Sequence, residues 1–150
     1  MRKLALLLAM VMALSVMPIT AFASESVELE VDVNVDSVMA DSTDEITYTV
    51  SLPEDANING ITLSILYDKE KLEWKSETTT GGTINSQTGI FTASSGTSIS
   101  TGTLFTVTFV PVSGAAGDAQ ISLDVTLCTT GIDITDVICT APSKTIIITK

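Results

Sequence analysis

Alternation of apolar and polar residues with a period of two is the feature that most limits how this chain can fold. The stretch 60–67 places an apolar or aromatic residue at every second position, beginning with Ile61 and ending with Tyr67. The run 46–52 repeats this pattern, and Pro53 ends it. Successive side chains of a strand point to opposite faces of a sheet, so both runs are typical of half-buried strands.

Turn-forming residues separate these runs, and no segment after residue 23 shows a convincing 3.6-residue apolar stripe. Asp68 closes the strand 60–67, a short charged turn follows, and alternation resumes at Leu72 and Trp74. About eight or nine short strands with turns between them predict an all-β fold, a single β-sandwich. One buried cluster is expected, made of Ile61, Leu63, Ile65, Tyr67, Leu72, Trp74, Phe105, Val107 and Phe109.

The N-terminus has the three parts of a secretory signal peptide. Arg2 and Lys3 precede an apolar run at 4–16, and Ala21-Phe22-Ala23 follows as a cleavage site. The alternative is a membrane anchor, but the run is well short of the roughly 20 residues of a spanning helix. We expect residues 1–23 to be removed and residues 24–150 to form one secreted domain without membrane insertion. Association with the cell surface remains open.

Charge and composition exclude several functions. The chain has 18 acidic and seven basic residues, a net charge of −11, and no histidine. Such a surface repels nucleic acid. Without histidine, a Cys-His nucleophile and a Cys/His zinc site are both ruled out. Ten acids lie within 25–55 and alternate with valines near its start, which indicates a solvated strand face rather than a calcium loop. We expect no catalytic residues, no cofactor and no metal.

Cys128 and Cys139 are the only two cysteines of the chain. They flank Gly131, and both neighbouring segments are predicted strands. A disulfide across neighbouring strands is slightly favoured for an exported protein, provided that the Cα atoms approach to about 5.5 Å. Two free thiols in a reducing setting are the alternative.

Three short patterns resemble the cohesin domain, the receptor module of cellulosome-type scaffolds. They are Tyr67-Asp68 followed by Leu72-Glu73, the glycine-led strand 102–109, and the segment 116–125. The resemblance covers roughly residues 46–150. It implies a jelly-roll β-sandwich that recognises a protein partner, with a dockerin-like module as the partner type.

A surface with little charge is the expected place for a protein partner, because interface centres are depleted of charged residues. Residues 78–117 carry no charge. Parity and the resemblance together give an expected patch on one outer face, made of Thr62, Ser64, Leu66, Ala93, Leu104, Thr106 and Thr108. By the resemblance, Ala93 and Leu104 fall near the family's apolar contacts. The family's Asn and Asp on its third strand would fall on Gly60 and Thr62, which cannot make those contacts.

Two other functions are open from the sequence. A carbohydrate-binding module would bind polysaccharide against exposed aromatic faces, but most aromatic residues here, Trp74 among them, are in phase with core residues. A cell-surface structural subunit would pair through sheet edges.

Overall fold

The computed structural model describes residues 26–131 and 135–150. These residues form thirteen β-strands joined by turns and loops, and they contain no helix. No helix among these residues could therefore cross a membrane. The larger sheet has the order β3 (Ser37–Met39), β13 (Lys144–Thr149), β10 (Gly117–Thr130), β5 (Gly60–Tyr67), β8 (Ile90–Ser94) and β7 (Thr83–Asn85), with β11 (Thr135–Asp136) paired to β10. The smaller sheet has the order β2 (Glu30–Val33), β4 (Ile46–Leu52), β9 (Gly102–Pro111) and β6 (Leu72–Thr79). A parallel pair joins β1 (Ser26–Glu28) to β12 (Ile138–Thr140).

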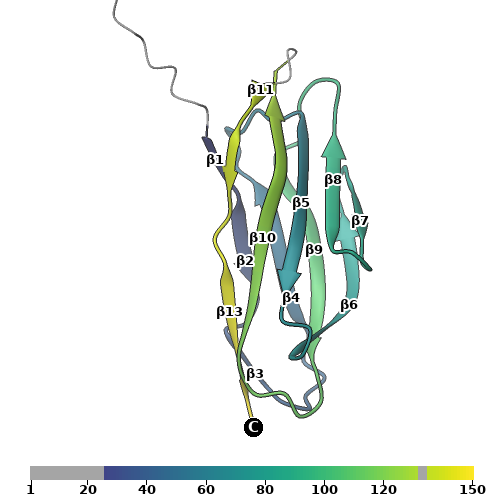
Figure 1. The fold of residues 1–150 in the computed structure, drawn as a ribbon, viewed down its shortest axis with the longest axis vertical. Helices are drawn as coiled ribbons and strands as arrows, with labels where there is room; N and C mark the ends of the chain where they lie inside the picture. Colours follow the sequence, from purple (N-terminus) through teal and green to yellow (C-terminus); the bar gives the residue numbers. More distant parts are fainter. Residues whose placement is uncertain (1–25, 132–134) are drawn as a thin grey trace, which may run out of the picture.

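The two sheets pack face to face, with β10, β5 and β8 in the front layer of Figure 1 and β2, β4 and β9 behind them. This confirms the predicted β-sandwich. The strands outnumber the predicted eight or nine because several, such as β3, β7 and β12, have only three residues. The predicted signal peptide, residues 1–23, lies outside the described residues.

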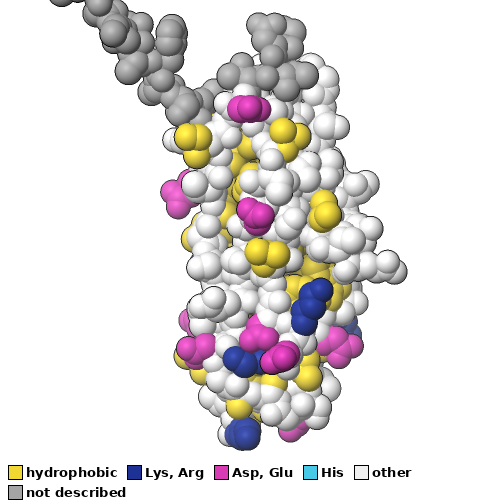
Figure 2. Space-filling view, in the orientation of Figure 1, with side chains coloured by type: hydrophobic (Ala, Val, Ile, Leu, Met, Phe, Trp, Pro, Cys, Tyr) yellow, Lys and Arg dark blue, Asp and Glu magenta, His cyan; other side chains and the backbone are white. Residues whose placement is uncertain are grey.

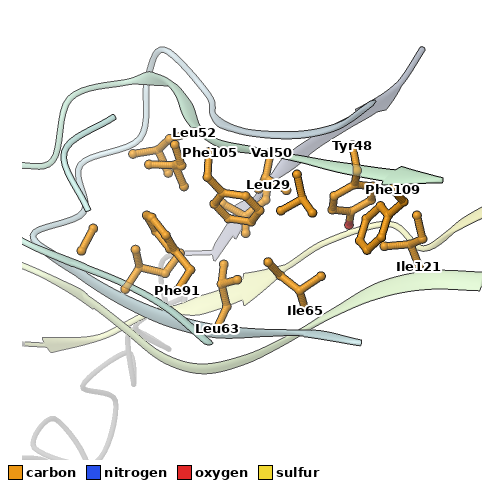
Figure 3. Close-up of a cluster of buried hydrophobic side chains, with 14 of the residues drawn as sticks. Leu29, Tyr48, Val50, Leu52, Leu63, Ile65, Phe91, Phe105, Phe109 and Ile121 are labelled. Atoms are coloured by element: carbon orange, nitrogen blue, oxygen red, sulfur yellow. The ribbon is translucent and has the colours of Figure 1, made fainter. Parts of the chain in front are cut away.

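Aromatic and branched aliphatic side chains from both sheets fill the space between the layers (Figure 3). Phe91 of the larger sheet packs on Phe105 of the smaller one, with ring centroids 4.8 Å apart. Every member of the predicted cluster is buried except Tyr67 and Trp74, which are half-buried. Their rings pack against Phe109, with centroids 4.9 and 5.5 Å away, so they form the rim of the same core.

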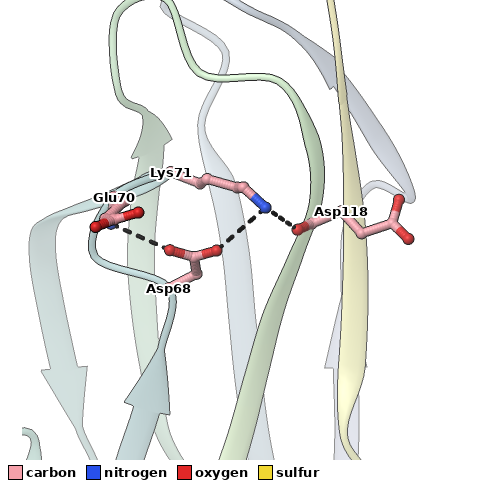
Figure 4. Close-up of polar contacts among 4 residues, drawn as sticks. All are labelled: Asp68, Glu70, Lys71 and Asp118. Carbon is pink, nitrogen blue, oxygen red and sulfur yellow. Dashed lines mark hydrogen bonds and ion pairs between the residues drawn. The ribbon is translucent and has the colours of Figure 1, made fainter.

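The stretch 60–74 carries the chain from one sheet to the other (Figure 4). One carboxylate oxygen of Asp68 accepts a hydrogen bond from the Glu70 backbone N–H at 3.1 Å, and the other lies 3.3 Å from Lys71 Nζ. Lys71 Nζ also donates to the backbone carbonyl of Asp118 at 2.6 Å. The predicted charged turn is therefore a corner, fastened to the beginning of β10.

Candidate functional site

The expected patch of seven residues does not exist as one surface. Thr62, Ser64 and Leu66 lie on β5 in the larger sheet, whereas Thr106 and Thr108 lie on β9 in the smaller sheet. These strands point their polar side chains away from the shared core, so the two groups face opposite sides of the sandwich. Parity gave the outward side of β5 and of Thr106 and Thr108 on β9 correctly but could not assign the strands to sheets.

Ala93 and Leu104 are corrections of a different kind, because both side chains are buried, at 3% and 0% exposure. Ala93 shares a face of β8 with Phe91, whose ring enters the core and turns Ile90 and Thr92 outward. Leu104 lies where the pairing of β9 with β4 shifts register. A bulge interrupts alternation, so that Leu104 and Phe105 both point inward.

Exposed large apolar side chains gather on one side of the molecule. Among the described residues they are Met39, Leu66, Ile90, Leu127, Ile138 and Ile147. All but Ile138 belong to the larger sheet, and Ile138 lies on β12. Isolated apolar side chains on a protein surface need no explanation, but their absence from the described strands of the smaller sheet does.

We define the front face by eight outward side chains in the central part of β10, β5 and β8: Thr62, Ser64, Leu66, Ile90, Thr92, Ser122, Asp124 and Leu127. Cross-strand pairing makes neighbours of Leu66 and Ser122, of Ser64 and Asp124, and of Thr62 and Leu127. Thr62 and Thr92 also approach through their hydroxyl oxygens at 3.4 Å. Asp124 is the one charged member of these eight, and the exposed Asp118 lies nearer the beginning of β10.

Figure 2 shows the front face as mostly uncharged surface with separate apolar side chains. The basic side chains visible in this view lie in its lower half (Figure 2). Acidic side chains are the charged groups drawn in the upper half (Figure 2). The arrangement offers a partner aliphatic contacts, hydroxyl groups and a weak negative field.

The opposite side of the sandwich has different chemistry. Thr47 and Thr49 of β4 pair with Thr108 and Thr106 of β9, and the hydroxyl oxygens of Thr49 and Thr106 lie 3.3 Å apart. Exposed acids of β2 border this threonine cluster. None of the exposed large apolar side chains of the described residues belongs to this sheet.

Solved structures that resemble this arrangement of strands include cohesin modules. A Clostridium thermocellum cohesin, solved in a type I cohesin–dockerin complex, matches with a TM-score of 0.60 at 15% identity, over 84% of this chain and 95% of that one. The seventh ScaB type I cohesin of Pseudobacteroides cellulosolvens gives 0.60 at 18% identity, over 82% and 90%. A non-cellulosomal cohesin of the archaeon Archaeoglobus fulgidus gives 0.56 at 17%, over 82% and 92%.

The chain has the fold of a cohesin module. The sequence resemblance is therefore confirmed at the level of the fold. No protein-family model matches the sequence, and no curated protein matches it.

One position departs from the cohesin pattern for a steric reason. Gly60 is buried, and a Cβ atom there would lie 2.6 Å from Thr129 Oγ1. Thr129 is itself buried and donates its hydroxyl to the side-chain oxygen of Asn59 at 2.9 Å. The Asn expected at this position from the resemblance has no room in the present packing. Thr62, the second position, remains on the front face.

Both cysteines and Asp41 make structural contacts in the described part of the chain. Cys128 of β10 and Cys139 of β12 form a disulfide, with Cα atoms 6.1 Å apart, as the sequence slightly favoured. No group of three or more acidic, cysteine or histidine side chains gathers there as a metal site. Asp41 instead joins two loops: it accepts hydrogen bonds from Ser113 Oγ and the Gly114 N–H, which hold the pKa of its carboxyl below its usual value.

Proposed function

We propose that this chain is a secreted, non-catalytic module that binds a protein partner of the dockerin type through its front face. The observation that carries the proposal is the restriction of exposed large apolar side chains to the larger sheet and β12. Leu66, Ile90 and Leu127 are 53%, 40% and 47% exposed and lie on three adjacent strands. Buried aliphatic contacts surrounded by polar groups are the usual anatomy of a protein interface.

The fold supports the choice of partner class. Several solved neighbours are cohesins in complex with dockerins, among them one from Clostridium thermocellum and one from Acetivibrio cellulolyticus. The steric closure at Gly60 means that this chain uses other groups than the family's third-strand Asn. Thr62, Ser64 and the aliphatic side chains of the front face are those groups.

Polysaccharide binding has less support, because the aromatic side chains of the described residues do not form an exposed platform. Tyr48, Phe91, Phe105 and Phe109 are fully buried. Trp74 is half-buried, and its indole N–H donates to Glu77 Oε2 at 2.7 Å. Tyr67 is also half-buried, with the Trp74 ring packed against it and Lys69 Nζ 5.6 Å from its ring centroid. Neither ring offers the broad exposed face on which a sugar ring stacks.

Pairing of copies through sheet edges is also disfavoured. The edge strands of the larger sheet, β3 and β7, have three residues each. In the smaller sheet, exposed acids line β2, and the pairing of β6 shifts register around the exposed Lys75. Short strands, charges and bulges are the devices that keep edges from pairing.

The partner class is tested by titrating the mature domain, residues 24–150, against a panel of purified dockerin modules loaded with calcium. Isothermal calorimetry should give saturable binding by at least one module and none after the dockerin is stripped of calcium. A cohesin with a known dockerin serves as the positive control. If that control binds while this domain binds no module of a broad panel, the proposal is wrong.

Export rests on residues 1–23, and the Cys128–Cys139 disulfide supports it because such bridges persist in oxidising compartments. The test is N-terminal sequencing of the protein recovered from the medium or cell surface of a secreting host. The proposal requires Ser24 as the first residue. Full-length protein retained inside the cells would contradict it.

A further inference from the structure

A groove of about 370 Å³ lies between β10 and β12, next to the front face. Polar and apolar atoms share its exposed lining about equally, and the residues around it include the disulfide: Val125, Thr126, Leu127, Cys128, Asp136, Val137, Ile138 and Cys139. The opening is separate from the core between the sheets, and it shares only Leu127 with the front face. We call it the β10–β12 groove.

The groove exists because β10 loses its strand neighbour partway along its length. Below it, β13 pairs with β10 as far as Ile121 and Lys144. Above it, two contacts hold β10 to the segment 137–139. They are the Cys128–Cys139 disulfide and the hydrogen bond from the Val137 N–H to the Cys128 carbonyl at 2.9 Å. Between these points β12 pairs with β1 instead.

The sequence explains this separation on both sides. Pro142 follows β12 and has no N–H to donate to β10. On the other side, the register of β10 against β5 shifts between Val125 and Leu127, so that Thr126 is an extra residue. A bulge bends its strand, and here the bend lies in the wall of the groove.

Two exposed aliphatic side chains connect the groove to the front face. Leu127 lines the groove and also pairs with Thr62 of β5. Ile138 lines the other wall and is 56% exposed. Between them lies the disulfide, with Cys128 nearly buried and Cys139 half-buried. A partner resting on the front face would therefore cover this opening and its two exposed aliphatic side chains as well.

The charges around the groove have one sign. Asp136 lines it, and Asp124 lies on the front face beside it, both exposed. The ion pair formed among the described residues joins Lys71 to Asp68, at the far corner of the sheet. Figure 2 likewise shows acidic but no basic side chains in the upper half of this view. Asp124 and Asp136 are thus left to attract a cationic group.

We propose that the β10–β12 groove is an anchor subsite of the partner interface, which receives an aliphatic side chain flanked by Lys or Arg on the bound dockerin-type module. The inference rests on the proposed function and adds to it where the strongest contact lies and what chemistry the partner brings. The occupant's aliphatic group packs on Leu127, Ile138 and the disulfide, while its cationic neighbour faces Asp124 and Asp136. Anchors of this kind, set in a pocket, carry a large share of binding energy.

The test compares Ile138→Asp with Ile147→Asp in titrations against the dockerin module that the wild-type domain binds most tightly in the panel. Ile147 is a matched control because it is an exposed isoleucine of similar accessibility, 47%, on β13 and away from the groove. Ile138→Asp should weaken binding by about tenfold or more, and Ile147→Asp by no more than about twofold. Melting temperatures of both variants close to that of the wild type establish that both are folded.

The charge arm uses Asp124→Asn with Asp136→Asn. Binding by this double variant should fall less steeply with added salt than wild-type binding, since two attractive charges are gone. Glu30→Gln with Asp32→Asn, on β2 of the other sheet, should leave the salt dependence unchanged.

Equal affinities of Ile138→Asp and Ile147→Asp, with wild-type binding intact, would overturn the subsite and leave the proposed function standing. An unchanged salt dependence of the Asp124 and Asp136 variant would overturn the cationic part. Absence of wild-type binding to the whole panel would overturn both proposals together.

Discussion

At the scale of single residues, Tyr48 combines full burial with an unsatisfied polar group. Its side chain is 0% exposed, and its hydroxyl has no hydrogen-bond partner within the described structure. A buried hydroxyl without a partner costs free energy. Tyr48→Phe should therefore raise the free energy of unfolding by about 1 kcal/mol at pH 7, measured by urea denaturation. A loss of stability would mean that the hydroxyl is bonded in solution.

The same residue predicts a pH dependence. Burial raises the pKa of Tyr48 above its ordinary 10.0. Unfolded Tyr48 loses its proton near pH 10 while the folded residue keeps it, so its stabilising contribution is complete below pH 10 and is lost above it. Denaturation midpoints of the wild type should drop more steeply between pH 9 and about 11 than those of Tyr48→Phe. Parallel profiles would count against this burial.

Asp41 predicts the opposite dependence, at acid pH. Its backbone φ is +61°, a conformation that Asn tolerates nearly as well, so Asp41→Asn removes the charge with little strain. The hydrogen bonds from Ser113 and Gly114 lower the pKa of Asp41 below 3.8. Its contribution is therefore present above pH 3.8 and lost as the pH falls. The melting temperatures of wild type and variant should converge in acid, and a constant gap would contradict this role.

At the scale of elements, the corner between β5 and β6 depends on Asp68. Its carboxylate accepts a hydrogen bond from the Glu70 backbone N–H and forms an ion pair with Lys71. Lys71 Nζ also donates to the backbone carbonyl of Asp118. Asp68→Ala should lower the free energy of unfolding by about 1 kcal/mol, because the side chains of the ion pair are still 30% and 31% exposed and the hydrogen bond supplies most of the effect. Glu70→Ala is the control: only its backbone takes part, so its change should stay within about 0.5 kcal/mol.

The disulfide is the second element-scale connection, since it holds β12 to β10 where pairing is sparse. Closing a loop of this length in the unfolded chain stabilises the fold by about 3 kcal/mol. The double variant Cys128→Ser with Cys139→Ser should lose about this much in urea denaturation without reductant. Adding reductant should lower the wild type to the level of the variant and leave the variant unchanged. Equal stability of both proteins before reduction would show that the bridge contributes nothing.

At the scale of the whole molecule, alternation was sufficient to predict the sandwich and most of its core. Ile61, Leu63 and Ile65 are buried because local parity and core position agree. The binding surface could not be read in the same way. Assignment of β5 and β9 to different sheets depends on pairings between distant segments, which parity does not contain.

Bulges and close contacts account for the remaining differences. Leu104 is buried because the register of β9 shifts beside it, and nothing in its immediate sequence marks that shift. The β10–β12 groove depends likewise on a bulge near Thr126 and on the departure of β12 toward β1. A glycine in a strand can indicate that another group packs closely against the backbone, as Thr129 does against Gly60. The sequence does not say which residue that group belongs to, and only the folded structure does.

The central claim is that partner binding belongs to the front face, and one pair of variants tests it most directly. Leu66→Asp and Thr78→Asp each add a carboxylate at an exposed strand position, on the larger and the smaller sheet respectively. Both should leave the melting temperature nearly unchanged, because surface substitutions usually stay within about 0.5 kcal/mol. Calorimetric titration with the bound dockerin module should show affinity lost by about tenfold or more for Leu66→Asp and retained for Thr78→Asp. Retained affinity in Leu66→Asp, or its loss in Thr78→Asp, would contradict the account.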